Sequence, residues 1–251
     1  MTDGFKAYRS LVWVELKLYL RETVATFFTL GFPVMLVLMF GSIYGNEPAA
    51  MFGGYGTVDV SVPSYAVMTA GTAGLMSLVP IIASYRERGI LRRLSTTPLR
   101  PLTFLLAEVS VLFVMSSIGV LLLVLTSKLV FGLRFRGDVL SVAGGFLLTC
   151  LSFYSLGFLL AGMLRTYRTA YAVTMVIFYP MLFMSGAGIP REVLPSWMQK
   201  LAMVFPMTHA VTLMKGLWLG KPWGDFGLET VVLTCVLGLC TAVSGKLFRW
   251  E

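Results

Sequence analysis

Charged residues, histidine and cysteine are all scarce in this sequence. Only 13% of its 251 residues are charged, histidine occurs once and cysteine occurs three times. The cysteines, Cys150, Cys235 and Cys240, stand in apolar runs and are expected to be small core side chains rather than ligands or disulfide partners. An aspartate-rich metal motif is also missing. A catalytic metal centre is therefore not expected.

A phosphate-binding loop is a second absence. The nearest match, residues 216–222, has the wrong spacing and ends in Pro222 where Ser or Thr is required. Only Glu108 places an ionisable group well inside an apolar run, whereas an ion-coupled transporter would carry several such carboxylates. If the chain transports a substrate, the energy is therefore expected to come from outside this chain.

Long hydrophobic runs dominate what remains. Hydrophobic residues make up 57% of the chain, and the mean hydropathy of +0.82 is far above that of a soluble domain. A helix needs about 20 apolar residues to cross a bilayer, and the ten-residue alternation of barrel strands is not seen. The sequence predicts an all-α integral membrane protein, one domain over residues 1–251. The six predicted transmembrane helices cover residues 23–44, 65–84, 102–127, 139–163, 170–189 and 228–247.

Basic residues in the connecting segments predict the orientation. With both termini cytoplasmic, thirteen Lys and Arg residues face the inside and seven face the outside, and residues 45–64 carry none. The net charge of +8 is divided among these membrane-flanking segments, without the basic and aromatic interleaving of a nucleic-acid module. Anionic membrane lipids, and not nucleic acid, are therefore the expected charged partners.

Residues 1–22 are expected to form an amphipathic helix in the cytoplasmic interface. A basic stripe includes Lys6, Arg9 and Lys17, while Glu15 and Glu22 lie seven residues apart on the other side. Two acids facing away from the basic stripe are costly against lipid. They either pair with arginines of the next cytoplasmic segment or extend to water.

That next segment, residues 85–101, carries five arginines between two predicted spans. Its first part continues as helix, Gly89 allows a bend, and Ser95, Thr96 and Thr97 precede Pro98, which suits the first turn of the following helix. The segment is either a solvated positive loop or a surface that another protein touches.

The order of these residues resembles the cytoplasmic coupling loop of ABC-2-type transporter permeases, the branch that includes daunorubicin-resistance and nodulation-factor export subunits. The resemblance covers nearly the whole chain. It implies that the loop docks on a separate ATPase subunit, which binds ATP and magnesium, and that two permease copies form the path across a bacterial plasma membrane. The ATPase-contact residues it implies are Arg86, Glu87, Arg88, Gly89, Arg92, Arg93, Leu94, Thr97 and Pro98.

Prolines divide the apolar residues 189–220 into pieces too short to span a membrane. Both this pattern and the family resemblance predict short re-entrant helices between spans five and six that close the path from outside; a simple interfacial loop is the alternative. The residues expected at this outer gate are Ser185, Gly186, Pro190, Pro195, Pro206 and His209. Prolines inside spans, Pro33, Pro80 and Pro180, either kink the helices as hinges or are simply tolerated.

Ser185 and His209 also leave an enzymatic alternative, because intramembrane serine proteases use such a pair. The glycine expected two residues before the serine is missing, and an oxyanion-hole motif is not evident. We therefore expect the chain itself to catalyse no reaction.

The preferred interpretation is the membrane subunit of an exporter for a hydrophobic or amphipathic compound, with polysaccharide or glycolipid export as the alternative. Glu108 either belongs to a polar relay with Glu15 and Glu22 or is held locally by Arg100. The side chains expected along the substrate path are Phe28, Met35, Met76, Phe178 and Met184.

Overall fold

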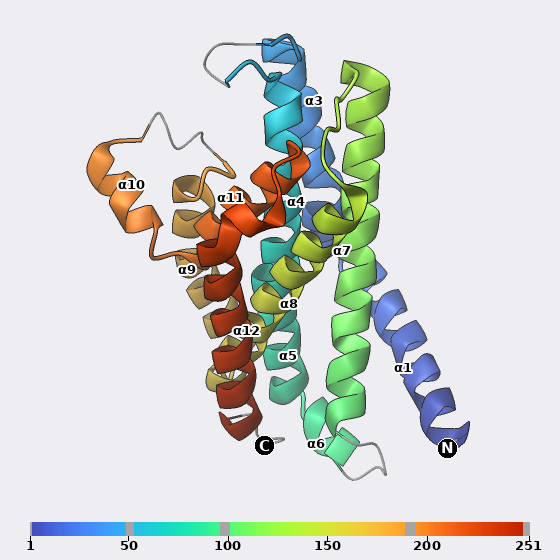
Figure 1. The fold of residues 1–251 in the computed structure, drawn as a ribbon. Helices are drawn as coiled ribbons and strands as arrows, with labels where there is room; N and C mark the ends of the chain where they lie inside the picture. The colour runs from blue at the N-terminus through green and yellow to red at the C-terminus, as the bar shows by residue number, and fades with distance from the viewer. Residues whose placement is uncertain (1, 49–52, 96–100, 189–193, 248–251) are drawn as a thin grey trace.

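The computed structural model describes residues 2–48, 53–95, 101–188 and 194–247, and every regular element in these ranges is helical. The elements are α1 (Thr2–Arg21), α2 (Thr23–Thr26), η1 (Phe27–Gly31), α3 (Phe32–Tyr44), α4 (Thr57–Gly71), η3 (Thr72–Ser77), α5 (Leu78–Glu87), α6 (Ile90–Ser95), α7 (Pro101–Phe131), α8 (Val139–Met163), α9 (Tyr167–Met184), α10 (Ser196–Ala202), α11 (Pro206–Trp218), η5 (Trp223–Phe226) and α12 (Gly227–Leu247). Both chain ends and α6 lie at one end of the bundle (Figure 1).

Five continuous helical stretches are long and apolar enough to cross a membrane. They cover Thr23–Tyr44, Thr57–Glu87, Thr103–Phe131, Val139–Met163 and Trp223–Lys246. These agree with five of the six predicted spans, the second being longer than expected. The remaining predicted span, residues 170–189, corresponds to α9, which is not among the five. An all-helical membrane protein is confirmed, and the count of six spans stays a prediction.

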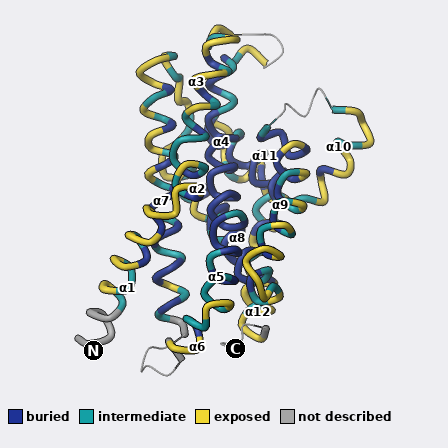
Figure 2. The backbone as a smooth tube through the Cα atoms, turned by 180° about the vertical axis from the view of Figure 1, so that it is seen from behind, coloured by how far each residue is buried: buried dark blue, intermediate teal, exposed yellow. Residues whose placement is uncertain are grey.

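The second stretch, α4–η3–α5, is the centre of the bundle. It is buried along almost its whole length, whereas α12 lies at the periphery and is mostly exposed (Figure 2). Small residues make this central position possible: a Cβ on Gly74 would lie 2.7 Å from the backbone of Phe153, and one on Gly157 would overlap the carbonyl of Gly74. Helices η3 and α8 therefore cross with their backbones in contact, which small residues allow.

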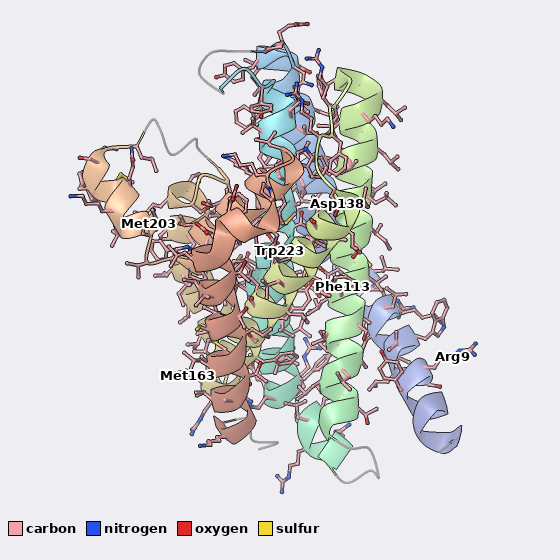
Figure 3. All side chains as sticks on the ribbon, in the orientation of Figure 1. Arg9, Phe113, Asp138, Met163, Met203 and Trp223 are labelled. Carbon is pink, nitrogen blue, oxygen red and sulfur yellow. The ribbon has the colours of Figure 1, made fainter. Side chains whose placement is uncertain are left out.

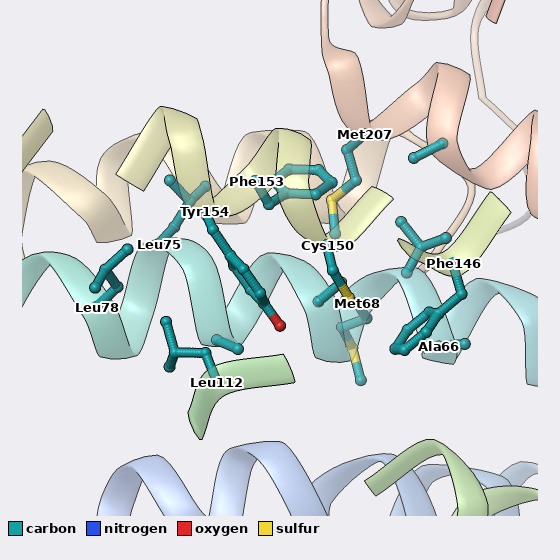
Figure 4. Packing of buried hydrophobic residues seen from close by; sticks show 14 of the residues in the cluster. Ala66, Met68, Leu75, Leu78, Leu112, Phe146, Cys150, Phe153, Tyr154 and Met207 are labelled. Atoms are coloured by element: carbon teal, nitrogen blue, oxygen red, sulfur yellow. The ribbon is translucent and has the colours of Figure 1, made fainter. Parts of the chain in front are cut away.

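The packed core around this crossing is mostly apolar. One buried cluster includes Cys150, Phe153 and Tyr154 of α8 and Met68, Leu75 and Leu78 of the central stretch (Figure 4). The hydroxyl of Tyr154 shares a 2.9 Å hydrogen bond with Ser116 of α7, so its one polar atom is satisfied inside the core. All three cysteines are free; Cys150 and Cys240 are buried, whereas Cys235 is exposed on α12, so the prediction of a core side chain was wrong there.

Two of the prolines inside spans follow a π-helical turn. Pro33 lies just after η1, and Pro80 lies three residues after η3. A proline donates no backbone hydrogen bond, and the wider turn takes up that irregularity without ending the helix. Pro180 lies inside α9. Irregular turns thus precede Pro33 and Pro80 but not Pro180, and a kink or hinge function stays a prediction.

Three segments are joined by Asn46 and Asp59 at the end of the bundle far from the termini. Asn46 Oδ1 accepts from the backbone N–H of Val58 at 3.1 Å, and its Nδ2 donates to Asp59 Oδ1 at 3.0 Å and to the carbonyl of Phe131 at 3.3 Å. Asp59, only 2% exposed, also accepts from the N–H of Arg134 at 2.9 Å. The ends of α3 and α7 and the start of α4 are thus held together.

Candidate functional site

A cavity of about 810 Å³ lies between the N-terminal helices, the central stretch and α9. Of the five side chains predicted along the substrate path, Phe28, Met76 and Phe178 line it. Met35 and Met184 do not: Met35 is 45% exposed on the surface of α3, and Met184 is buried near the end of α9. The wall is largely aromatic, with contributions from Phe28, Phe32, Phe40, Tyr65, Tyr171, Phe178, Tyr179 and Phe183.

Two buried carboxyl groups line the cavity, Glu15 from α1 and Glu108 from α7. Glu15 is 7% exposed and Glu108 2%. Tyr85 Oη donates a 2.7 Å hydrogen bond to Glu15 Oε2, whereas Glu108 Oε2 is buried and accepts no hydrogen bond from the described residues. Burial raises the pKa of Glu15, and the hydrogen bond from Tyr85 offsets part of this shift.

Helix α1 is anchored to the bundle by one polar face. Tyr8 shares a 2.7 Å hydrogen bond with Ser110 of α7, and Tyr19 shares one of 2.7 Å with Thr29 of η1. Residues 8, 15 and 19 are spaced so that they lie on the same side of a helix. Arg9 projects away from the bundle (Figure 3). The basic stripe predicted this amphipathic helix, but the face that attaches α1 to the bundle is the one that carries Tyr8, Glu15 and Tyr19.

The partner of Glu15 differs from the one predicted. Its hydrogen bond comes from Tyr85, the residue directly before the arginines, and Glu22 is exposed at the cavity. Arg100, the local partner suggested for Glu108, lies outside the described residues. Sequence analysis did not single out Tyr19 or Tyr85, although Tyr19 follows Glu15 by one helical turn.

Arg86 and Glu87, two of the predicted ATPase-contact residues, hold the corner between α8 and α9. Arg86 Nη1 donates to the carbonyls of Ala161 and Leu164 at 2.6 and 2.7 Å, at the C-terminus of α8. Glu87 Oε2 accepts from the N–H of Tyr167 at 2.9 Å, at the start of α9. A cation at a helix C-terminus and an anion at an N-terminus both complement the helix dipole.

The rest of the basic segment turns away from the bundle. The predicted bend is at Gly89, whose φ of +67° is readily adopted only by glycine, and α6 follows it. Arg88, Arg92 and Arg93 are exposed at the end of the bundle that holds both termini. Thr97 and Pro98 lie outside the described residues, as does the side chain of Leu94. A docking role for this segment stays a prediction.

The predicted outer gate forms two short helices, α10 and α11. Pro195 precedes α10 and Pro206 begins α11, so both prolines stand where a helix tolerates them. Lys215 Nζ lies 3.5 Å from the carbonyl of Gly186, which links α11 to the turn after α9. Pro190 lies outside the described residues.

Ser185 and His209 are bonded to local backbone and not to one another. Ser185 Oγ donates to the carbonyl of Leu182 at 3.2 Å and accepts from the N–H of Ala187. His209 Nε2 donates to the carbonyl of Met203 at 2.9 Å. Both side chains are therefore used as caps of turns, an arrangement that offers no activated nucleophile.

Long apolar helices, an anchored amphipathic helix and a large lined cavity define a polytopic helical membrane protein of the transport type. The family model of the ABC-2 type transporter matches residues 6–218, and the chain belongs to that family.

Three relatives illustrate this membership. The chain is 28% identical over 198 residues to a putative transport permease, ycf38, of Cyanophora paradoxa, covering 76% of this chain and 67% of the relative. It is 25% identical over 228 residues to the daunorubicin resistance ABC transporter permease protein DrrB1 of Streptomyces coeruleorubidus, covering 86% and 77%. It is 25% identical over 173 residues to the inner membrane transport permease YhhJ of Escherichia coli, covering 68% of this chain and 44% of that protein. This chain thus spans less than half the length of YhhJ.

Proposed function

We propose that this chain is the membrane subunit of an ATP-driven exporter of hydrophobic or amphipathic compounds. One observation carries the proposal: the aromatic cavity and the basic segment share residues, because Glu87 and Arg88 line the cavity and also begin the turn into α6. A force applied to α6 therefore acts directly on the cavity wall. Its volume of about 810 Å³ suits a ligand of drug size.

A separate ATPase subunit supplies that force in this proposal. It binds ATP and magnesium and docks on the exposed arginines of α6 and the adjoining turn. Because Arg86 and Glu87 hold the α8–α9 corner, a movement of α5 carries the beginning of α9, which forms the opposite wall of the cavity. Family membership supports such a partner.

The topology we propose has six spans, with α9 as the fifth in chain order. Both termini and α6 lie at the same end of the bundle, which supports an even number of crossings (Figure 1). The basic residues of this end favour the cytoplasmic side of a bacterial plasma membrane. Helices α10 and α11 then lie toward the outer side, as re-entrant helices that close the path.

A second permease copy, identical or homologous, completes the transport path in this proposal. The N-terminal helices leave apolar side chains exposed beside the cavity, including Met35, Leu38 and Met39 of α3. Such side chains suit either lipid or a second copy.

Charge reversal on α6 tests the proposed docking. The double variant Arg92→Glu and Arg93→Glu, coexpressed with the cognate ATPase, is expected to lose copurification of that subunit and ATP-dependent substrate movement in proteoliposomes. The matched control is Lys128→Glu, which reverses an exposed charge at the far end of α7 and is expected to change neither. Unimpaired copurification and transport in the double variant would contradict docking at α6.

A further inference from the structure

The ionisable side chains that line the cavity differ in how deeply they are buried. Among the described residues that line it, the carboxyl groups of Glu15 and Glu108 are buried, whereas the charged side chains at its mouth are exposed. The exposed group is Arg21, Glu22, Glu87, Arg88 and Arg168. Water screens the exposed groups strongly and the buried ones little, so a positive group inside the cavity interacts more strongly with Glu15 and Glu108 than with the mixed charges at the mouth.

Glu108 Oε2 has no hydrogen-bond partner among the residues that the structure describes. This oxygen is buried, although the side chain lines the cavity. An unpaired carboxyl oxygen away from water costs free energy, and ionisable groups at membrane depth normally serve a ligand path. The second carboxyl, Glu15, lies close enough to interact electrostatically with it. A positively charged ligand group placed between Glu15 and Glu108 in the cavity would interact favourably with both carboxyl groups.

The remaining wall suits the rest of such a ligand. Phe28 and Phe32 line the cavity from the N-terminal side and Phe178 and Tyr179 from α9. Phe28 and Phe32 are 5.1 Å apart and Phe178 and Tyr179 are 5.8 Å apart between ring centroids, so each side carries a continuous aromatic surface. Aromatic faces attract cations as well as apolar groups.

We propose that this cavity binds a cationic amphiphile, with the positive group at Glu15 and Glu108 and the apolar body against the aromatic walls. This inference rests on the proposed export function and gives its substrate class. An anionic amphiphile is disfavoured by the two buried carboxyl groups, and an uncharged one without a hydrogen-bond donor leaves Glu108 Oε2 without a partner.

Two probes of the same shape and opposite charge test the proposal in the purified chain. Tetraphenylphosphonium and tetraphenylborate each carry four phenyl rings, and binding of each is measured by equilibrium dialysis against protein in detergent, with empty micelles as the blank. Saturable binding of tetraphenylphosphonium, at least about tenfold tighter than that of tetraphenylborate, is expected because the difference reflects buried charge. Equal affinity for the two probes, or tighter binding of the borate, would overturn the proposal.

A variant series assigns the binding to Glu108. Glu108→Gln keeps the size of the side chain and is expected to weaken tetraphenylphosphonium binding about tenfold or more, the usual effect of removing a charged partner. The control is Glu229→Gln, a carboxyl group of α12 outside the cavity, with an expected change below about twofold. Gel filtration checks the folding of each variant. If Glu108→Gln does not fold, the relative affinity of the wild-type protein for the two probes still tests the proposal.

Unchanged binding in a folded Glu108→Gln variant would overturn the assignment. These measurements use no ATPase, so their failure is distinct from failure of the exporter proposal: a chain that moves substrates with ATP but prefers the borate is an exporter of another substrate class.

Discussion

Arg86 and Glu87 are neighbours in sequence, yet they hold the facing ends of two different helices. The guanidinium of Arg86 binds carbonyls at the C-terminus of α8, and the carboxylate of Glu87 binds the N–H of Tyr167 at the start of α9. Consecutive side chains point in different directions from a helix end, so one turn of α5 reaches both sides of the α8–α9 corner. The basic segment is thus part of the scaffold as well as a candidate docking surface.

Replacing Arg86 is expected to destabilise the fold. Arg86→Gln removes two charge-assisted hydrogen bonds to α8, at an expected cost of about 1–3 kcal/mol. Thermal unfolding in detergent measures the loss as a lower melting temperature. Arg165→Gln, an exposed arginine of the same corner, is the control and is expected to cost less than about 0.5 kcal/mol. Equal melting temperatures for the two variants would argue that the hydrogen bonds of Arg86 to the C-terminus of α8 do not stabilise the fold.

Replacing Glu15 is expected to stabilise the protein at high pH only. Burial raises the pKa of Glu15 above its ordinary value of 4.5, so folding favours the protonated form. The contribution of protonated Glu15 to the free energy of unfolding is complete below pH 4.5, and it is lost as the pH rises through the pKa of Glu15 in the folded state. Glu15→Gln keeps an acceptor for Tyr85 without the charge, so its melting temperature should match the wild type near pH 4 and exceed it near pH 8. A variant less stable than the wild type near pH 8 would show that the carboxylate is stabilised in place.

A methyl group at the helix crossing is expected to disrupt it. In Gly157→Ala the new Cβ overlaps the carbonyl of Gly74, and because that atom is backbone, α8 must move, at a cost of about 1–3 kcal/mol. Gly238→Ala is the control, since a Cβ there meets nothing within 4 Å and alanine is the better helix former. The two melting temperatures should move in opposite directions, and a stabilised Gly157→Ala would mean that the crossing is looser than described.

Ser185→Ala should leave transport intact. The hydroxyl serves a turn after α9, and its loss is expected to cost about 1 kcal/mol of stability and no function. ATP-dependent transport of the variant in proteoliposomes checks this. Hydrolytic activity that is independent of an ATPase and disappears in Ser185→Ala would instead establish the serine hydrolase.

Local pattern was enough to predict the helices but not the orientation of all their faces. Phe28 and Met35 are seven residues apart, and in a regular α-helix both would face the cavity. The π turn η1 inserts one extra residue between them, which rotates the following helix by about 100°, so Leu36 lines the cavity and Met35 is exposed. Nothing in the hydrophobic pattern marks this insertion.

Long-range partners were also beyond the sequence. Arg86 looks like its neighbours Arg88 and Arg92 when only charge is considered, and its acceptors are 75 and 78 residues away. The bend at Gly89 could be predicted from sequence, because a bend between two short helices depends on local backbone conformation. Glycine adopts the required positive φ at little cost.

The bonds of Asn46 and Asp59 determine what kind of movement the bundle permits. They tie α3, α4 and the end of α7 at the end away from α6. If the proposed ATPase displaces α6, a bundle held at Asp59 is expected to tilt about that end, and the largest movement is expected where the cavity meets the basic segment.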